Sequence, residues 1–459
     1  MKKGFLALLL AAGKGTRFKS DKVKVLYPML GKSMLRLLTE SIQSLEPEKV
    51  YVVVGYQKDE VMKEASSLKV RFVHQKKQLG TAHAVMAAKN ILLKEKEKDV
   101  LIINADLPLL RPDTLKPFLN SHWMRGNSLT FLSAELENPT GFGRILCSGN
   151  NMIKVIEEKD AMPSERKIKE VNAGVYLFKI KDLLEALPKV TNKNKKGEFY
   201  LTDIIEILDR KRKKIGVYKT SHPEEIIGIN NRYELAKAIE ALRERKIKSL
   251  AEGGVTILDP LTTWIDLDVK IGKDSTICSS VIIEGNSVIG AQSKLYPFVH
   301  IIDSRVGKRV KILSLTMIEE SVIEDETQVG PFAHLRPKTV LRKGSKVGNF
   351  VEMKNTIFGR RSKAGHLSYL GDTEVKEGVN IGAGTITCNY DGLKKHKTTI
   401  EAGAFIGSGT ELVAPVKIGK RAYVAAGSTI TKNVSPESLA ISRSKQEEKP
   451  RRIKRKKGK

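Results

Sequence analysis

Hydrophobic residues follow two different patterns along the chain of 459 residues. In the first half, short apolar runs alternate with stretches in which apolar residues recur every three or four positions. Such runs are typical of buried parallel strands, and such stretches are typical of the helices that cover them. We expect strands at Phe5–Leu10, Val50–Val54 and Val100–Asn104, and helices at Ser33–Leu45 and Thr81–Leu93. The first half is therefore predicted to be an α/β domain with a mostly parallel sheet.

Beyond Gly254 the aliphatic residues recur every six positions. This period fits neither an α-helix nor the hairpins of a sandwich, and it indicates a β-helix in which each hexapeptide forms one side. A glycine often follows the aliphatic residue, where a larger side chain would crowd the backbone at a corner. We expect a register slip near Ser304–Val322 and a protruding loop at Asn389–Thr399. The residues predicted to point inward are Ile271, Ile277, Ile283, Ile289, Leu295, Ile301, Ile323, Val329, Leu335, Leu341, Val347, Met353, Ile400, Ile406, Leu412, Ile418, Val424 and Ile430.

A charged amphipathic helix is expected between the two patterns, at Leu235–Ser249, and it is ended by Gly253 and Gly254. We therefore predict four segments: a first domain at 1–232, a helical linker at 233–253, a β-helix at 254–443 and a basic, flexible tail at 444–459. At the other end of the chain, Lys2 and Lys3 followed by an apolar run imitate a secretory signal. No small-residue cleavage pattern follows, and a buried strand that leads into a glycine-rich loop explains the run better.

The composition narrows the class of protein. Hydrophobic residues make up 41% and charged residues 29%, which suits a protein with a substantial core and argues against wholesale disorder. No apolar run reaches the length of a transmembrane helix. The three cysteines, Cys147, Cys278 and Cys388, are too scattered for a disulfide framework or a metal site, which favours a reducing, cytoplasmic setting.

The formal net charge of +29 suits anionic partners, whether nucleic acid, an acidic membrane surface or phosphorylated small molecules. Part of the charge lies in Lys445–Lys459, with nine basic and two acidic residues, which is expected to be a solvated end. A nucleic-acid-binding protein would carry aromatic stacking residues amid the charge, whereas aromatic residues make up only 6%. A function that requires nucleic acid is therefore not expected.

Three loops of the first domain offer groups for a phosphorylated ligand. Leu10–Arg17 and Lys24 place backbone N–H groups and cations at a strand end, where open α/β sheets bind ligands. Gln78–Thr81 repeats the order of strand, loop and helix. Asp106 follows an apolar strand, where a carboxylate suits Mg²⁺ held against phosphates. Alone, the glycine-rich loop could equally be a structural turn, and Asp106 would more often be a helix cap or a loop residue than a ligand.

These loops belong to a longer series of ordered segments. The series comprises LAAGKGTR (10–17), QLGTAHA (78–84), GFGRI (141–145), IEEKDA (156–161), VNAGVY (171–176), GEFYLTDII (197–205), INNR (229–232), VGPFAHLRP (329–337), VGNFVEMKN (347–355), KAGHLSYLGD (363–372), VNIGAGTITCNYDG (379–392), GSGTELVAP (407–415) and LAISR (439–443). With them the chain, from about residue 4 to 443, resembles the family of bifunctional N-acetylglucosamine-1-phosphate uridyltransferases and glucosamine-1-phosphate acetyltransferases.

The resemblance implies an α/β Rossmann-like nucleotidyltransferase domain followed by a left-handed parallel β-helix, assembled as a homotrimer. The implied substrates are UTP, N-acetylglucosamine-1-phosphate, glucosamine-1-phosphate and acetyl-CoA. Mg²⁺ is expected on Asp106 and Asn230. The residues expected to hold the nucleotide and the sugar are Leu10, Ala11, Ala12, Gly13, Arg17, Lys24, Gln75, Gly80, Thr81, Gly143, Glu157, Asn172 and Asn230.

For the second domain the resemblance implies His366 as the general base, a group whose ordinary pKa suits proton transfer near neutral pH. The amino-sugar phosphate is expected to bind Arg336, Lys354, Tyr369 and Asn380. Acetyl-CoA is expected to contact Ala383, Asn389, Tyr390, Ser408, Ala426 and Arg443. Cys388 invites a covalent acetyl intermediate, but a packed position in the β-helix is preferred.

One departure from the family pattern concerns the metal segment. The family usually has Tyr-Gly-Asp where this chain has Asn104-Ala105-Asp106, so the contacts of the two preceding positions are in doubt. A different hypothesis also remains: a sugar-1-phosphate nucleotidyltransferase whose β-helix only assembles or regulates. Such a β-helix would have no need of His366, Asn380 or the Asn389–Tyr390 loop.

Overall fold

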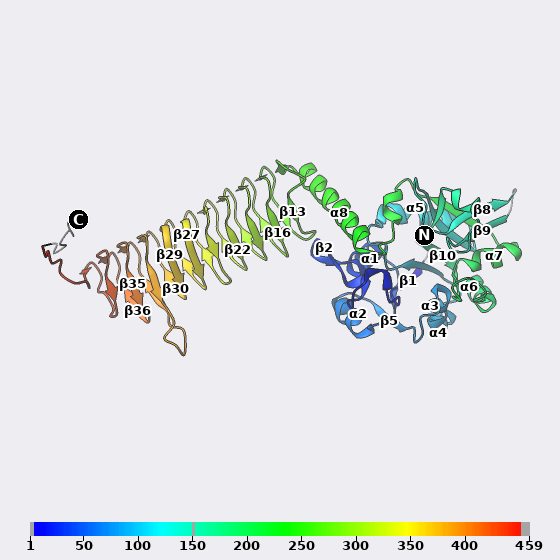
Figure 1. Ribbon diagram of the computed structural model, residues 1–459, viewed down its shortest axis with the longest axis horizontal. Coiled ribbons are helices and arrows are strands. Elements are labelled where there is room, and N and C mark those ends of the chain that lie inside the picture. Colours follow the sequence, from blue (N-terminus) through cyan, green and yellow to red (C-terminus); the bar gives the residue numbers. More distant parts are fainter. Residues whose placement is uncertain (1–3, 149–151, 451–459) are drawn as a thin grey trace, which may run out of the picture. The chain divides into compact units, whose positions relative to one another are not determined.

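The computed structural model describes residues 4–148 and 152–450, in two compact units, Met1–Leu242 and Arg243–Lys459 (Figure 1). Their boundary falls inside helix α8 (Arg232–Glu252), which covers the helix expected from the sequence. Ser444–Pro450 is exposed and contains no helix or strand, and the rest of the predicted tail lies outside the described residues. Within the described ranges, no helix is both apolar and long enough to span a bilayer.

The first unit is built on a twisted sheet of nine strands within its described residues. The path of the sheet runs β11-β7-β10-β6-β1-β4-β5; β6, β1, β4 and β5 are parallel, and β10 runs against both of its neighbours. A hairpin of β8 and β9 attaches to β10. The strands are β1 (Phe5–Leu10), β4 (Lys49–Val54), β5 (Arg71–His74), β6 (Asp99–Asn104), β7 (Leu129–Glu135), β8 (Arg144–Ser148), β9 (Met152–Ile156), β10 (Glu170–Lys179) and β11 (Ile215–Lys219).

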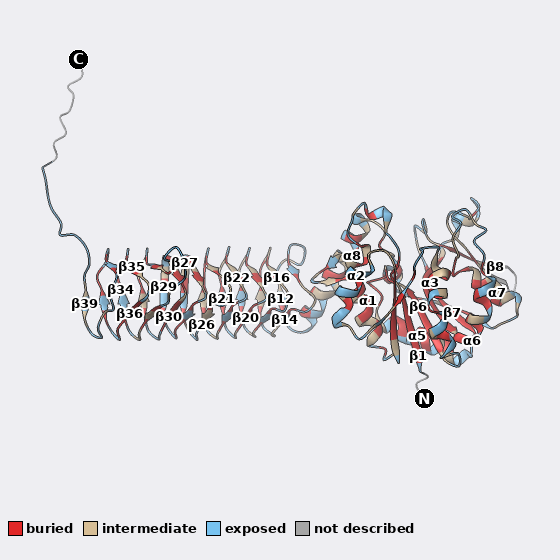
Figure 2. Cartoon of the chain, turned by 90° about the horizontal axis from the view of Figure 1, so that it is seen from below, coloured by how far each residue is buried: buried red, intermediate tan, exposed pale blue. Residues whose placement is uncertain are grey.

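Helices cover both faces of this sheet, and its strands lie buried between them (Figure 2). In β1, Ala7 and Leu9 pack toward one layer of helices and Leu6 and Leu8 toward the other, which explains why the strand is apolar throughout. The first layer is α1 (Met34–Gln43), α2 (Lys58–Glu64) and α5 (Pro112–Arg125); the second is α3 (Thr81–Ala87), α4 (Lys89–Leu93), α6 (Ile180–Ala186) and α7 (Asp203–Arg210).

The helix expected at Thr81–Leu93 is interrupted. α3 ends and α4 begins at Ala88, whose ψ of 1° leaves the helical range. Ala84, Ala88 and Leu92 still face the same core, so the apolar pattern continues across the break. The pattern therefore predicted the buried face correctly but not the interruption, for which this segment has no glycine or proline signal.

The second unit is a left-handed parallel β-helix with three faces (Figure 1). It runs from β12 (Thr256–Ile257) to β39 (Leu439–Ala440), and its strands are two or three residues long except β27 (Lys346–Lys354) and β29 (Lys363–Gly371), which continue around a corner. We call the faces first, second and third in the chain order of β12, β13 (Trp264–Ile265) and β14 (Lys270–Ile271). The aliphatic residues predicted to point inward fill one continuous core, with Ile271 partly buried at its edge. Both predicted domain types are thereby confirmed.

The corners differ in how they tolerate changes of length. Between Ile271 and Ile430, the inward residues are six apart at the corner from the first to the second face and at the corner from the third to the first. At the second corner, from the second to the third face, Ile301 and Val306 are only five apart, as are Met353 and Phe358. The loop expected at Asn389–Thr399 also leaves from this corner, between β32 (Ile386–Cys388) and β33 (Thr398–Ile400) (Figure 1).

Small residues after the inward positions allow neighbouring coils to approach closely. A Cβ on Gly348 would lie 1.8 Å from the carbonyl oxygen of Gly365, and one on Gly382 would lie 2.5 Å from the backbone nitrogen of Ser408. Both distances are far below van der Waals contact. The glycine pattern of the sequence therefore reflects the stacking of one coil on the next.

The first corner, from the first to the second face, carries one left-handed residue per coil. After Ser280, these residues are large and exposed in five coils, with φ angles between 43° and 62°: Phe298, Leu315, Phe332, Phe350 and Leu367. The rings of Phe332 and Phe350 stack with their centroids 5.1 Å apart. In the later coils the same position is occupied by Gly384, Gly409 and Gly427. We call the five large residues the apolar stripe.

Candidate active sites

A cavity of about 350 Å³ opens in the first unit, at the carboxyl ends of β1 and β6. The loop after β1 supplies backbone from Leu10 to Gly15, and Gly13 leaves open space where a Cβ would stand. Lys24 contributes a cation. The predicted residues that line this cavity are Leu10, Ala11, Ala12, Gly13, Lys24, Gln75, Gly80, Thr81 and Asp106.

A second cavity, of about 170 Å³, shares Thr81, Asn104 and Asp106 with the first. The other predicted residues that line it are Arg17, Gly143, Glu157, Asn172 and Asn230. Residues from distant parts of the sequence are therefore brought together in two adjoining compartments.

Gln75 and Gly80 shape the loop beside the first cavity. Gln75 is buried and its amide donates to the carbonyl of Gly80 at 3.2 Å. Gly80 has a φ of 112°, and a Cβ there would lie 2.5 Å from the backbone oxygen of Phe199. The Thr81 hydroxyl accepts from the backbone N–H of Leu201 at 2.9 Å. Glycine is thus required at position 80 by both the backbone conformation and the close neighbour.

Two cations bind the residues expected to hold the metal. Lys24 Nζ lies 2.7 Å from Asp106 Oδ2, and Arg17 donates to Asn230 Oδ1 at 2.7 Å. A Cβ on Gly228 would lie 3.7 Å from both Asp106 Oδ1 and Asn230 Nδ2, so the two side chains flank the same glycine. Carboxylate and amide oxygens are ligands that Mg²⁺ prefers, and the donor set therefore fits that ion.

The second cavity contains buried polar groups that suit a sugar. Glu157 accepts from the hydroxyl of Thr202 at 3.1 Å, and burial raises the pKa of its carboxyl. Asn172 donates to the hydroxyl of Tyr176 at 2.6 Å. Burial also raises the pKa of Tyr176, so its hydroxyl stays protonated. These carboxyl, amide and phenol groups can exchange hydrogen bonds with sugar hydroxyls.

The two residues that depart from the family pattern lie in different environments. Asn104 lines both cavities, and its amide nitrogen lies 2.5 Å from where a Cβ of Gly174 would stand. Ala105 is buried in the core of the sheet instead. Position 104 therefore faces the substrate cavities, whereas position 105 faces the core.

In the second unit, His366 lies on β29 at the first corner, directly opposite Asn349 of β27. His366 Nδ1 is 2.5 Å from Asn349 Oδ1. A carboxamide oxygen can only accept, so Nδ1 donates this hydrogen bond, and in the neutral ring the lone pair is on Nε2. The imidazole is exposed. This is the tautomer that a general base requires.

Arg336, Lys354 and Tyr369 gather on the second face and its second corner. Glu352 binds Arg336 at 2.8 Å and raises the pKa of its guanidinium. Lys395, which the sequence reasoning did not single out, lies beside Lys354, and this neighbouring ammonium group lowers the pKa of Lys354. Arg336 and Lys395 both act on Lys354, so three cations gather here and suit a phosphate group.

The residues expected to contact acetyl-CoA fall into two groups. Along the first corner, Gly409 N donates to the carbonyl of Ala383, Gly427 N to that of Ser408, and Arg443 to that of Ala426. Asn389 and Tyr390 lie instead at the second corner, where Asn389 donates to Asp372 at 2.5 Å. Asn380, which is expected to bind the amino-sugar phosphate rather than acetyl-CoA, lies on the first face, one coil beyond Lys363. One chain therefore places the two groups at opposite edges of its second face.

Cys388 is half-buried in β32, and burial raises the pKa of its thiol. The thiolate that would attack a thioester is therefore disfavoured at this position. The structure supports a packing role for this residue.

Known proteins are similar to this chain in both units. A nucleotidyl transferase family model matches residues 6–266, and a bacterial transferase hexapeptide (six repeats) model matches residues 397–432. The bifunctional protein GlmU of Syntrophomonas wolfei is 43% identical over 447 residues, covering 97% of this chain and 99% of the relative. That of Thermotoga maritima is 47% identical over 440 residues, covering 96% of each chain.

The chain belongs to the GlmU family. The bifunctional protein GlmU of Streptococcus agalactiae is likewise 44% identical over 441 residues, covering 96% of this chain and 95% of the relative. Because the similarity extends over both units, the predicted family of bifunctional uridyltransferases and acetyltransferases is confirmed, and the chain is an enzyme of that class.

Proposed function

We propose that the cavities of the first unit transfer uridylyl from UTP to N-acetylglucosamine-1-phosphate, releasing pyrophosphate. Lys24, Arg17 and the backbone N–H groups of the loop after β1 would neutralise and orient the phosphates. Asp106 and Asn230 would hold Mg²⁺, which supplies further neutralisation of the charge on the phosphates when it is bound. Glu157 and Asn172 would fix the sugar.

The second unit would acetylate glucosamine-1-phosphate with acetyl-CoA. Arg336, Lys354 and Lys395 would hold the phosphate. His366 Nε2 would take a proton as the amine attacks the thioester carbonyl; the new C–N bond forms, the C–S bond breaks, and the proton can pass to the departing thiolate. The observation that carries this assignment is the hydrogen bond from His366 Nδ1 to Asn349 Oδ1, which places the lone pair of the neutral ring on Nε2. A β-helix that serves only assembly would not need this arrangement.

We also infer that the protein is a homotrimer in which neighbouring chains complete the acetyl-transfer sites. The apolar stripe supports this inference, because bulky residues with positive φ are strained and their large side chains are exposed in one chain. Phe350 and Leu367 directly follow Asn349 and His366, so a chain that covers the stripe also approaches the base. It could bring its own Asn389 and Tyr390 to the Ala383–Ser408–Ala426 row, which lies at a different corner within one chain.

The test is whether the purified protein makes UDP-N-acetylglucosamine from glucosamine-1-phosphate, UTP and acetyl-CoA in the presence of Mg²⁺. Acetylation of glucosamine-1-phosphate without UTP would separate the bifunctional enzyme from a nucleotidyltransferase with a non-catalytic β-helix. Absence of acetylation in trimeric protein would contradict the proposal for the second unit.

A further inference from the structure

A fully buried carboxylate lies in the first unit, outside both cavities. Glu225 belongs to the short helix η6 (Pro223–Ile226) and has no exposed surface. Its Oε2 accepts from the backbone N–H of Arg111 at 3.1 Å, and its Oε1 accepts from Arg111 Nε. A buried carboxylate needs such partners, and removal of either one leaves an uncompensated polar group. Glu225 and Arg111 therefore form a specific link between two segments.

Each of these segments leads to one of the proposed metal ligands. Arg111 is the N-cap residue of α5 and ends the loop that begins at Asp106. Glu225 is followed by the loop that ends at Asn230. A second link joins the loops at their other ends, where the backbone N–H of Ile229 donates to the carbonyl of Asp106 at 3.0 Å. The two loops are thus fastened together at both ends, with the metal pair at one of them.

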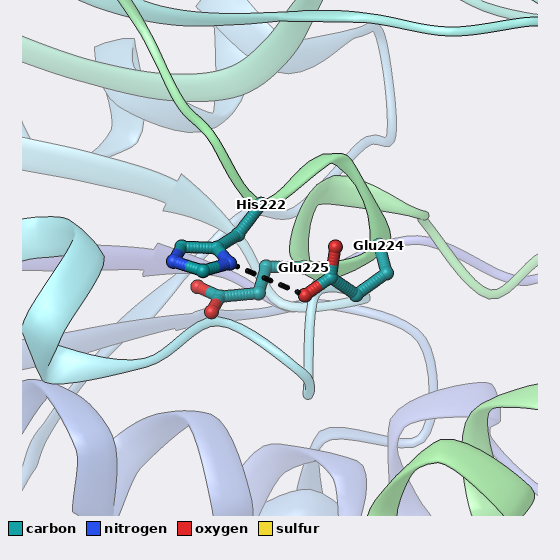
Figure 3. A group of neighbouring side chains, drawn as sticks. All are labelled: His222, Glu224 and Glu225. Atoms are coloured by element: carbon teal, nitrogen blue, oxygen red, sulfur yellow. Dashed lines mark ion pairs between the residues drawn. The ribbon is translucent and has the colours of Figure 1, made fainter.

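The residues around Glu225 also allow a different assignment, in which Glu225 itself binds a metal ion. His222, Glu224 and Glu225 place ligand atoms within 4.8 Å of one another, and Figure 3 shows the ion pair between His222 and Glu224. Both oxygens of Glu225, however, already accept hydrogen bonds from Arg111. A carboxylate engaged in this way is suited to fixing a loop rather than to ligating an ion.

We infer that Glu225 is a positioning residue for uridyl transfer: through Arg111 it holds Asn230 opposite Asp106 and so sets the affinity of that pair for a divalent cation. The inference rests on the proposed function of the first unit. Partners that orient metal ligands typically change metal affinity by about 10- to 100-fold when they are removed. Glu225 does not touch the substrate cavities, so its effect should fall on the metal requirement.

The experiment uses the full-length protein and measures Mn²⁺ binding directly, from the electron paramagnetic resonance signal of free Mn²⁺. Glu225→Ala is expected to weaken Mn²⁺ binding by at least about tenfold. It should raise the Mg²⁺ concentration for half-maximal uridyl transfer by a similar factor, while saturating Mg²⁺ restores most of kcat. Glu225→Gln, which turns one acceptor into a donor facing Arg111, should shift both values in the same direction. Acetyl transfer by the second unit reports that each variant is folded and assembled.

Glu224→Gln is the matched control, because it alters the next residue of the same turn and leaves the link to Arg111 intact. It should leave Mn²⁺ binding unchanged. If Glu225→Ala does not fold, Arg111→Ala tests the same link, since its backbone N–H can still donate while the guanidinium is lost. Unchanged Mn²⁺ binding in folded Glu225→Gln and Arg111→Ala would overturn the inference. So would an equal loss of Mn²⁺ in Glu224→Gln and Glu225→Gln, which would place the ion at the His222 group.

The failure of this inference can be told apart from failure of the proposed function. If Asp106→Ala abolishes Mn²⁺ binding but the Glu225 variants do not weaken it, only the positioning role is wrong. If Asp106→Ala retains Mg²⁺-dependent uridyl transfer, the proposed metal pair itself is wrong.

Discussion

Lys24 Nζ and Asp106 Oδ2 form an ion pair of 2.7 Å between the loop after β1 and the loop after β6. A lysine that neutralises Asp106 would compete with the proposed metal ion for this carboxylate. The same ammonium group can instead turn to the nucleotide phosphates. The pair would therefore connect binding of the proposed metal ion with binding of the nucleotide.

The first prediction follows from this competition. Lys24→Met should strengthen Mn²⁺ binding several-fold in the absence of nucleotide, because one positive charge leaves the neighbourhood of Asp106. The same change should raise KM for UTP by about tenfold or more, since a phosphate loses its counter-charge. Isothermal titration and steady-state kinetics measure the two effects. Lys22→Met, on the exposed neighbouring loop, is the control; weaker Mn²⁺ binding by Lys24→Met would contradict the prediction.

The two activities should be separable by single substitutions, because the units have separate cores. Asp106→Ala should abolish uridyl transfer and leave acetyl transfer near normal. His366→Ala should reduce acetyl transfer by about 10²–10⁴-fold, the usual contribution of a general base, with uridyl transfer unaffected. Addition of N-acetylglucosamine-1-phosphate should restore UDP-N-acetylglucosamine formation by the His366 variant. Equal damage to both reactions in folded protein would show that two independent sites are the wrong description.

Charge on the apolar stripe should prevent assembly. Phe332→Glu combined with Phe350→Glu replaces two stacked rings with repelling carboxylates, so the proposed trimer should not form and the variant should be monomeric. Acetyl transfer should fall by at least about two orders of magnitude, whereas uridyl transfer should persist. Light scattering and the two assays measure these outcomes. Leu261→Glu, an exposed leucine away from the stripe, should remain trimeric, and an active monomer of the double variant would exclude shared sites.

Lys395 should contribute to phosphate binding. Its ammonium group lowers the pKa of Lys354, and a bound phosphate dianion would relieve that repulsion. Lys395→Ala should therefore raise KM for glucosamine-1-phosphate by about tenfold, with a much smaller change in KM for acetyl-CoA. Lys397→Ala is the control, because Lys397 binds Glu374 at 2.6 Å instead. A rise in KM for acetyl-CoA alone would assign Lys395 to the other substrate.

The stability of the first unit should depend on the ionisation of Asp203. Burial, with Glu157 nearby, raises its pKa from 3.8 to about 6. A raised pKa in the folded state favours folding below the unfolded value, and this contribution is lost as the pH rises through 6. After allowance for partial exposure, the ionised carboxylate costs about 1 kcal/mol at pH 7.5.

Asp203→Asn should therefore raise the Tm of the first unit by about 3 °C at pH 7.5, with little difference near pH 4. Differential scanning calorimetry at the two pH values measures the change. Asp21→Asn, on an exposed loop, should show no such dependence on pH. An equal shift at both pH values would assign the effect to packing rather than to ionisation.

The sequence predicted the β-helix well because its inward positions repeat with a fixed period and are filled by large aliphatic residues. Ala364 and Thr387 also occupy inward positions, but one is small and the other is polar. The hydrophobic pattern therefore did not predict the inward residues between Met353 and Ile400. The five-residue steps after Met353 and Leu370 were missed for a different reason, because they break the period of six. Periodicity reports only residues that are apolar and regularly spaced.

The sites were less accessible to such reasoning. Residues within recognisable motifs, such as Asp106 and His366, could be singled out before the structure was known. Lys395 could not be singled out in this way, because its approach to Lys354 depends on how the loop between β32 and β33 folds back onto the β-helix. The link between Arg111 and Glu225 joins positions 114 residues apart and carries no local pattern. Contacts set by tertiary folding leave no period in the sequence.

The variable spacing at the second corner has a consequence for how such a protein can acquire new chemistry. A residue added or removed within a strand would turn an inward side chain outward, whereas a change at this corner leaves the stacked coils in register. Thr387 and Ile400 are thirteen residues apart, whereas the inward residues at the other two corners are six apart. The additional length forms the loop that contains Asn389, Tyr390 and Lys395. Loop closure costs only a slowly growing entropy. The second corner can therefore accept insertions that carry new functional residues, while the constant spacing at the other two corners maintains the β-helix.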